Sequence, residues 1–538
     1  YAGGMRAPDA AVAANLIAAA FVLPFLLLSA TAGQVADKYD KVLVLRVVKV
    51  CEVGIMMLAG LGFATHQMPV LLAALFLMGT HSTFFSPAKY GLLPEVLVED
   101  ELVGGNALLE MGTFLAILLG TLLAGLLAEW GDLRLATATL VGIAVAGLGF
   151  SLAIPRLRPA LPTLRLDWNL WRATRANLAA AYRDPTVFLA VLGVSWFWFY
   201  GILVLAQVPL YAKQVLNGTE QVVTLLLVGF SLGVGAGSLL CERLSGRRLE
   251  IGLVPLGSFG LTLFGADLYF ATPPTPGGAP LEALAFLATH GAWRVLGDVV
   301  LVGMSGGLYI VPLYALIQTR SERSHQSRII AANNILNAIF MVVASLAAAG
   351  LLHAGLSLPQ LYLVVGLMNA AVALFVYALV PEFLMRFIIW MLIHSVYRLR
   401  KSGLEAVPEE GPALIVCNHV SFVDALVIAA ACPRPIRFVM DHAIFRIPVL
   451  SWLFRQVKAI PIAPARVDPD AAPEGQDTLF VLVPAAAGAA LTAVLVSMAM
   501  WRDGALPALA VQRSLPLRRR ASAARCAHRL GSPRAAQR

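Results

Sequence analysis

Long apolar stretches follow one another along most of the chain, and short polar stretches separate them. About 20 apolar residues cross the hydrocarbon core of a bilayer as a helix, and eleven stretches approach or exceed that length. They cover residues 11–32, 42–64, 70–86, 104–128, 134–154, 186–212, 221–241, 251–271, 298–318, 329–352 and 358–380. The pattern predicts a mainly α fold, a polytopic bundle of membrane-spanning helices.

The composition supports this interpretation. Hydrophobic residues make up 59% of the chain and charged residues 13%, whereas a soluble domain is nearer a quarter charged. The cysteines have no metal-ligand spacing and are interpreted as unpaired packing residues: Cys51, Cys241, Cys417, Cys432 and Cys526. We expect neither a metal nor a bound cofactor, and we expect membrane lipids rather than nucleic acid as partners.

The formal charge of +9 is unevenly distributed among the connections. Lysine and arginine gather at residues 38–49, 89, 156–183, 243–248, 320–328 and 386–401, whereas 65–69, 129–133, 272–284 and 353–357 hold almost none. Because basic loops stay in the cytoplasm, we expect these loops and everything after residue 381 to be cytoplasmic. Eleven spans that end in the cytoplasm begin outside it, so a further helix upstream of Tyr1 is also expected.

A loop motif lies between the first two predicted spans. Gly33 is followed by Asp37, and the basic residues Lys38 and Lys41 come next. The glycine lets two helices approach, and the aspartate can cap the next helix or pair with a basic partner. The motif resembles the loop signature of the major facilitator superfamily, and residues 237–248 repeat it more weakly. The resemblance implies two six-helix halves, 1–154 and 186–380, joined by a cytoplasmic linker at 155–185.

Few charged or strongly polar residues lie inside the predicted spans or within a turn of their ends, where a charge is costly unless it faces a cavity or a partner. They include Glu52, His81, Glu110, Arg294 and Asp298. Arg294 and Asp298 are four residues apart and are predicted to pair. Glu52 either pairs with Lys49, three residues before it, or contacts a substrate, and the sequence leaves both interpretations open.

Small and amide side chains in the second half are interpreted as packing features. Gly229, Gly233 and Gly237 recur every four residues and predict a helix-packing face. Asn333 and Asn337 share a helix face, where hydrogen bonds between helices are the expected role.

Three stretches within the first 380 residues resemble bacterial lysophospholipid transporters. They are residues 79–94 (GTHSTFFSPAKYGLLP), 100–108 (DELVGGNAL) and 309–314 (YIVPLY). Members of that family move lysophospholipids, notably lysophosphatidylethanolamine, from the outer to the inner leaflet. The resemblance implies a lysophospholipid as the substrate of this chain.

The series of long apolar stretches ends at residue 380. An interfacial helix is predicted at 383–393, within a linker at 381–404. A short apolar run at 413–417, predicted as a buried strand, leads to the sequence NHVSFVD at 418–424. A histidine can take the proton from a hydroxyl that attacks a thioester, and a carboxylate can orient it. His419 and Asp424 are therefore the candidate base and its partner, and a helix that begins near His419 would bring them to one side.

This motif resembles that of the glycerophospholipid acyltransferases, which include the enzymes that acylate lysophosphatidate. Residues 445–462 are similar to the second block of that family, and the resemblance covers 405–466. It implies a partial α/β acyltransferase domain in the cytoplasm that re-acylates the lysolipid. Acyl-acyl carrier protein or acyl-coenzyme A would be the acyl donor, and acyl carrier protein would then be a partner.

One expected element of that family is missing. A Phe-Pro-Glu-Gly block should hold the phosphate-bearing substrate well downstream of the histidine, but only Pro473-Glu474-Gly475 occurs, close to the histidine and after a polar stretch. We interpret it as a coincidence, which leaves Glu474 outside the predicted site. Residues 467–538 are rich in Ala, Arg and Pro and are predicted to be an atypical tail.

Two other functions remain open. The chain could export another substrate class, such as drugs, with an inert tail, or it could be an acyltransferase that the helices only anchor. The stretch at 79–108 favours a lipid substrate, and the charged loop motif favours transport over anchoring.

Overall fold

The computed structural model describes residues 7–246, 249–273, 277–379 and 381–399, and shorter stretches at 407, 413–417, 423–432, 436–446, 451, 454–455 and 459–462. The chain divides into two compact units, one of residues 1–411 with 426–436 and the other of residues 412–425 with 437–538. Several predicted features lie outside the described residues: Arg247 and Arg248, His419, Glu474, and the tail at 467–538.

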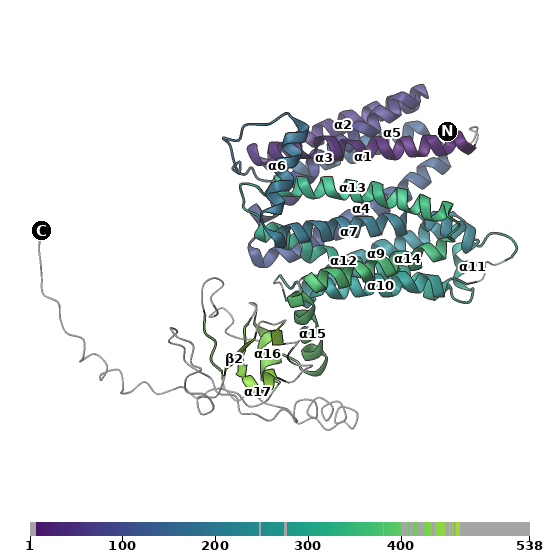
Figure 1. Cartoon of the computed structure of the whole chain (residues 1–538). Helices are drawn as coiled ribbons and strands as arrows, with labels where there is room; N and C mark the ends of the chain where they lie inside the picture. The colour runs from purple at the N-terminus through teal and green to yellow at the C-terminus, as the bar shows by residue number, and fades with distance from the viewer. Residues whose placement is uncertain are drawn as a thin grey trace, which may run out of the picture. The chain divides into compact units, whose positions relative to one another are not determined.

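Each of the eleven predicted spans corresponds to a helix of the first unit (Figure 1). The helices are α1 (Ala7–Lys38), α2 (Lys41–Thr65), α3 (Met68–Val96), α4 (Leu102–Trp130), α5 (Leu133–Leu152), α7 (Pro185–Leu205), α9 (Glu220–Ser245), α10 (Leu253–Ala271), α12 (Ala292–Arg320), α13 (Gln326–His353) and α14 (Leu358–Leu379). Among the described residues, ten helices are long and apolar enough to cross a membrane. The predicted polytopic helix bundle is confirmed.

Shorter elements connect or follow these helices. They are η2 (Glu99–Glu101), α6 (Leu170–Tyr182), α8 (Val208–Leu210), the π-helical turn η3 (Tyr211–Val215), α11 (Ala283–Leu287) and α15 (Pro381–Val396). Side-chain caps fix where several helices begin. Asp40 accepts a hydrogen bond from the backbone N–H of Val42 at the start of α2, and Asp132 and Asp184 cap α5 and α7 in the same way.

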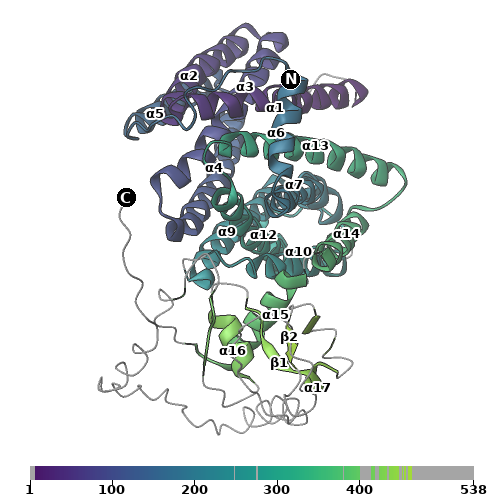
Figure 2. The same ribbon diagram turned by 60° about the vertical axis from the view of Figure 1, so that its left-hand side comes forward.

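Two helix pairs hold the halves of the bundle together. α1 packs against α13, and α4 packs against α9. Figure 2 shows α4 and α13 between the remaining helices of the first half and those of the second. These four helices therefore form the seam of the bundle.

Glycines allow the closest helix packing in the second half. A Cβ atom on Gly233 would lie 2.1 Å from the carbonyl oxygen of Val300, and one on Gly237 would lie 2.0 Å from that of Met304. No real side chain fits at such distances, so α9 and α12 approach this closely only because both positions are glycine. The predicted packing role of these glycines is confirmed.

The linker carries the helix α6, which runs across the long helices rather than alongside them (Figure 1). It packs against both α1 and α13, and so it bridges the seam. Its end of the bundle also holds the connections 39–40 and 321–325. We call this the basic end, because the arginine-rich stretch 156–183 lies there.

The described part of the second unit is small. The strands β1 (Val439–Asp441) and β2 (Ile460–Ile462) pair in parallel, and α17 (His442–Phe445) follows β1. The predicted buried strand at 413–417 is wrong as far as the structure describes it, because these residues form no strand and are exposed. An extended segment becomes buried only where a neighbouring strand or helix covers it, and the one sheet among the described residues consists of β1 and β2.

Candidate functional site

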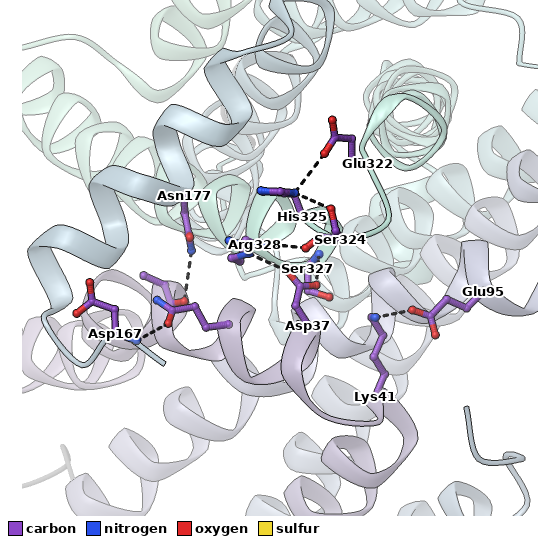
Figure 3. Close-up of polar contacts among 12 residues, drawn as sticks. Asp37, Lys41, Glu95, Asp167, Asn177, Glu322, Ser324, His325, Ser327 and Arg328 are labelled. Atoms are coloured by element: carbon purple, nitrogen blue, oxygen red, sulfur yellow. Dashed lines mark hydrogen bonds and ion pairs between the residues drawn. The ribbon is translucent and has the colours of Figure 1, made fainter. Parts of the chain in front are cut away.

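Asp37 joins the two halves at the basic end (Figure 3). Its carboxylate is fully buried and accepts a hydrogen bond from the backbone N–H of Ser327 at 3.0 Å. Its other oxygen accepts one from Nε of Arg328, also at 3.0 Å. Asp37 lies on α1, and both donors lie in the first turn of α13, where a helix dipole favours a negative charge. The expected basic partner of Asp37 is therefore Arg328, and the helix that it caps is α13 rather than α2.

The other residues of the loop motif support this contact. A Cβ on Gly33 would lie 2.6 Å from that of Ala331, so the glycine lets α1 and α13 meet. Lys41 is buried and forms an ion pair with Glu95 within the first half. Lys38 instead places its ammonium 5.6 Å from the centre of the Tyr39 ring.

The linker adds further hydrogen bonds around Asp37. The backbone N–H of Asp167 donates to the side-chain oxygen of Gln34 at 2.7 Å, and the Asn177 amide donates to the carbonyl of Ala30 at 3.3 Å.

His325 lies beside Arg328 at the start of α13, and burial, together with that guanidinium, lowers the pKa of the ring. The imidazole is therefore uncharged near pH 7. We call the contacts of Asp37 with Ser327 and Arg328 the clasp.

Other hydrogen bonds cross between the halves on the same side of the bundle centre. Asn106 on α4 donates to the Gln318 side chain on α12 at 2.6 Å, and Gln318 donates to the carbonyl of Tyr90 at 3.2 Å. Ser86 donates to Asn334 at 3.2 Å. Together with the clasp, these bonds close the halves against each other at the basic end.

A cluster of polar side chains lies beside this closed region. Glu110 is only 1% exposed, and the Tyr90 hydroxyl donates to its carboxylate at 2.6 Å. The ring of Tyr90 stacks on that of Tyr314 with centroids 4.4 Å apart. The ammonium of Lys89 lies 4.5 Å from the centre of the Tyr90 ring, and no ion pair of Lys89 is found among the described residues.

Lys89 was expected in a loop, and that expectation is wrong because the residue lies within a helix. The predicted span ended at residue 86, but α3 continues to Val96 with Pro87 and Pro94 inside it. Membrane helices tolerate proline where neighbouring helices satisfy the backbone groups that it frees. The lysine is therefore part of α3.

Glu52 forms the first of the two contacts that the sequence left open, and the contact with a substrate stays a prediction. Its carboxylate accepts a hydrogen bond from Lys49 at 2.7 Å, which confirms the local pair. The same oxygen lies 3.4 Å from Nε2 of His81 on α3. Glu52 therefore belongs to a group of three titratable side chains on two helices, in which Glu52 and His81 are buried and Lys49 is partly buried.

The predicted pair of Arg294 with Asp298 is wrong. Arg294 instead forms two hydrogen bonds with Asp267 on α10, at 3.0 and 2.6 Å. Asp298 faces inward and is 5% exposed, whereas the side chain of Arg294 is 54% exposed. Two parallel hydrogen bonds between a guanidinium and a carboxylate are strong, which favours Asp267 as the partner of Arg294. Asp267 could have been found in the sequence as a carboxylate inside a predicted span.

Only one of the two candidate catalytic residues is described. Asp424 begins α16 (Asp424–Ala431), where its charge suits the helix N-terminus. Whether a helical turn near residue 419 brings the two side chains to one side stays a prediction, because residues 418–422 lie outside the described residues. His419 lies outside the described residues, and the separation of the two side chains stays untested.

Comparison with known proteins identifies the family of the larger unit. Residues 9–344 match the family model of the Major Facilitator Superfamily. The chain belongs to this superfamily. The Lysophospholipid transporter LplT of Cronobacter sakazakii (strain ATCC BAA-894) is 30% identical over 319 residues, which cover 56% of this chain and 70% of that protein. The protein of that name from Pectobacterium carotovorum subsp. carotovorum (strain PC1) is 29% identical over 315 residues, 56% of this chain and 69% of its own.

Solved structures of the superfamily have the same fold. The E. coli fucose:proton symporter FucP superposes with a TM-score of 0.52 at 12% identity, over 68% of this chain and 91% of its own. The proton:xylose symporter XylE gives a TM-score of 0.52 at 13% identity, over 70% of this chain and 87% of its own. At such low identity these matches support the fold alone.

A second family model, Acyltransferase, matches residues 398–479. The predicted recognition of a transporter followed by an acyltransferase domain is therefore confirmed. The match extends past the predicted 405–466 at both ends, and it includes the Pro473-Glu474-Gly475 sequence that we interpreted as a coincidence.

Proposed function

We propose that the chain carries lysophospholipids, such as lysophosphatidylethanolamine, from the outer to the inner leaflet of a bacterial inner membrane. Two relatives named as lysophospholipid transporters support this substrate. The single observation that carries the proposal is the cluster of Lys89, Tyr90 and Glu110 inside an apolar bundle. A lysophospholipid head group needs this combination of a cation for its phosphate, with polar partners nearby.

Lys89 is our candidate for the phosphate contact. Its ammonium faces the Tyr90 ring rather than a carboxylate, so it can take up an anion without first breaking an ion pair. Glu110 and the Tyr90 hydroxyl already form a hydrogen bond to each other and stand beside it. They could accept the ammonium of an ethanolamine head group.

The clasp would determine the side of the membrane toward which the transporter is closed. Basic loops favour a cytoplasmic location for the basic end, so the contacts of Asp37 with Ser327 and Arg328 would close the transporter toward the cytoplasm. Release of lysolipid to the inner leaflet then requires these contacts to break. Asp37 would act as a switch, together with Gly33, Lys38 and Lys41 of its motif.

The acyltransferase region would act on the delivered lysolipid. In this proposal His419 is the general base for the lysolipid hydroxyl, and Asp424 orients it. The acyl group would come from acyl-acyl carrier protein or acyl-coenzyme A. The transporter would thereby place the lysolipid in the leaflet where re-acylation takes place.

The test is uptake of labelled lysophosphatidylethanolamine by spheroplasts that express the full chain. Lys89→Gln should reduce the initial rate by on the order of tenfold or more, because a charge-assisted contact with phosphate is lost. Lys213→Gln is the matched control, since Lys213 is exposed and pairs with Glu220 away from the cluster. Membrane amounts of each variant are measured by immunoblot.

Two outcomes would contradict the proposal. Uptake of cationic dyes with no uptake of lysolipid would favour a drug exporter. Equal lysolipid uptake by Lys89→Gln and by the unmodified chain would remove Lys89 from the substrate site.

A further inference from the structure

The linker helix α6 exposes one face that consists of aromatic and arginine side chains. Trp171 is 87% exposed and Tyr182 is 69% exposed, and Trp168, which lies just before the helix, is 71% exposed. Arg175 is exposed as well. At 3.6 residues per turn, positions 171, 175 and 182 point within about 40° of one another. We call this side of α6 the linker face. An exposed patch of large aromatic side chains marks an interaction surface.

The opposite face of α6 is buried against the bundle. Ala173, Asn177 and Ala181 are each at most 2% exposed. The Asn177 amide donates to the carbonyl of Ala30 on α1, and Ala173 packs with Ala30 and with Ile335 of α13. Because α1 and α13 hold this side of the helix, the linker face looks away from the bundle.

The contacts of α6 also determine its level along the bundle. Ala30 lies eight residues before the end of α1 at Lys38, which is about 12 Å along the helix. The apolar stretch that predicts this span ends at residue 32. α6 therefore lies beside the point at which α1 leaves the hydrocarbon, where lipid head groups surround a membrane protein.

The direction of α6 suits this level. The helix runs across the long helices rather than alongside them (Figure 1). Membrane-spanning helices are tilted by only about 20° from the membrane normal on average, so α6 lies close to the plane of the membrane. Helices that lie in the head-group layer typically carry aromatic residues and arginines in this way. Tryptophan and tyrosine are enriched there because their rings are apolar with one polar edge.

The charge of the linker indicates the kind of lipid. Residues 155–185 contain six arginines, no lysine and two aspartates, an excess of four positive charges. Arg172 pairs with Asp167, whereas neither Arg175 nor Arg183 has an ion pair among the described residues. Arginine binds phosphate groups through two parallel hydrogen bonds. Arg175 and Arg183 can therefore bind anionic head groups without first breaking an ion pair.

We propose that the linker face, with Arg183 at its edge, binds anionic phospholipids of the leaflet at the basic end. The aromatic rings lie among the head groups, and the arginines bind the phosphates. The level of α6 favours lipid over a soluble acidic protein, because the helix lies beside the spans and not beyond the end of the bundle. The linker face contains no residue of the proposed substrate cluster, so this inference goes beyond the proposed function and does not depend on it.

Selective lipid binding by the full chain tests the charged part of this surface. The purified protein in a neutral detergent is titrated with phosphatidylglycerol and, separately, with phosphatidylcholine, which has no net charge. Native mass spectrometry measures how much of each lipid the protein retains. The unmodified chain should prefer phosphatidylglycerol. Arg175→Gln combined with Arg183→Gln should reduce this preference by roughly tenfold or more, since one arginine near an anionic surface contributes about fivefold.

Arg134→Gln combined with Lys213→Gln is the matched control. Both residues are exposed, Arg134 in the first turn of α5 and Lys213 in η3, and neither element is part of the linker. The control removes the same amount of charge and should keep the preference of the unmodified chain. An unchanged preference in the linker variant, or an equal loss in the control, would overturn the proposal.

A fluorescent probe tests the level of the linker face in a bilayer. In a chain whose native cysteines are replaced by alanine, Ala179→Cys carries a bimane at an exposed position on α6, one turn from Arg175. In proteoliposomes, phosphatidylcholine with a nitroxide on its head group should quench this bimane several-fold more than it quenches a bimane–glutathione conjugate in solution. Equal quenching of the two would overturn the proposal. A shift of the bimane emission on addition of acyl carrier protein, without quenching by the labelled lipid, would overturn it in favour of an acidic protein partner.

Discussion

Asp37 shows how one buried carboxylate can join two halves of a transporter. Both of its oxygens are used, one by the backbone of Ser327 and the other by Arg328, and all three groups lie at the junction of α1 with α13. A buried charge is stable only while such partners remain in place. Separation of the halves at the basic end must therefore replace these contacts, which makes Asp37 suitable as a switch.

Asp37→Asn tests this role at a single residue. Asparagine keeps the shape but removes the charge opposite Arg328, so the closed basic end should be destabilised and lysolipid uptake should fall by about tenfold or more. The amount of folded protein should stay near normal. Uptake by spheroplasts and fluorescence size-exclusion chromatography measure the two quantities. Asp132→Asn is the control, since Asp132 caps α5 at the opposite end, and unchanged uptake in Asp37→Asn would remove the switch role.

The acyltransferase site gives a second residue-scale prediction. His419 and Asp424 supply a base and its orienting partner, but the chain lacks the Phe-Pro-Glu-Gly block that should position the phosphate of the lysolipid. Positioning contributes a large share of catalysis. We therefore expect the purified chain to show little or no conversion of lysolipid to diacyl lipid with either acyl donor.

The matched comparison is a family member that contains the block, in which alanine at the equivalent histidine or aspartate should cost orders of magnitude in rate. A normal rate in the present chain that disappears in His419→Ala would contradict the prediction. Glu474 would then be the residue to test as a phosphate-holding group, since the matched region reaches residue 479.

The close packing of α9 against α12 depends on glycines, which carry no side chain. The carbonyl oxygen of Met304 occupies the space that a Cβ on Gly237 would need. Gly237→Ala should therefore push the helices apart and lower the temperature at which the detergent-solubilised protein aggregates. The expected cost is about 1–3 kcal/mol, as for other overpacked cores.

Gly297→Ala serves as the control on α12, because nothing lies within 4 Å of a Cβ at that position. Alanine there should be neutral or slightly stabilising, since it favours the helix. Equal destabilisation by both substitutions would contradict the packing argument and indicate a general intolerance of the bundle.

Sequence patterns located the elements well but not the contacts between them. Apolar length identified every long helix of the described bundle, because a bilayer permits little besides helices at that depth. The pairing of Asp37 with Arg328 and of Arg294 with Asp267 could not be predicted, because the partners lie 291 and 27 residues apart in the sequence. Pairing over such separations is set by tertiary packing, which the local spacing of Arg294 and Asp298 does not determine.

At the scale of the whole molecule, the charge distribution and the helix arrangement agree with each other. The arginine-rich linker, the clasp and the connection 321–325 all lie at one end of the bundle. The connections without lysine or arginine, such as 353–357, lie at the other end. The rule that basic loops stay in the cytoplasm therefore assigns each of these connections to one side of the membrane. Once one connection is located, the sides of the others follow.

Cysteine labelling tests this orientation. In a chain whose native cysteines are replaced by alanine, Trp171→Cys places a thiol at a position that is 87% exposed on the linker helix α6. Because basic loops stay in the cytoplasm, a membrane-impermeant maleimide should label it only after the cells are permeabilised. Ala279→Cys, on an exposed stretch of the opposite end, should react in intact cells and shows that the reagent reaches the protein. Labelling of Trp171→Cys in intact cells would show that the assigned topology is reversed. The clasp would then lie on the outer side, and its contacts would close the transporter toward the outside instead of toward the cytoplasm.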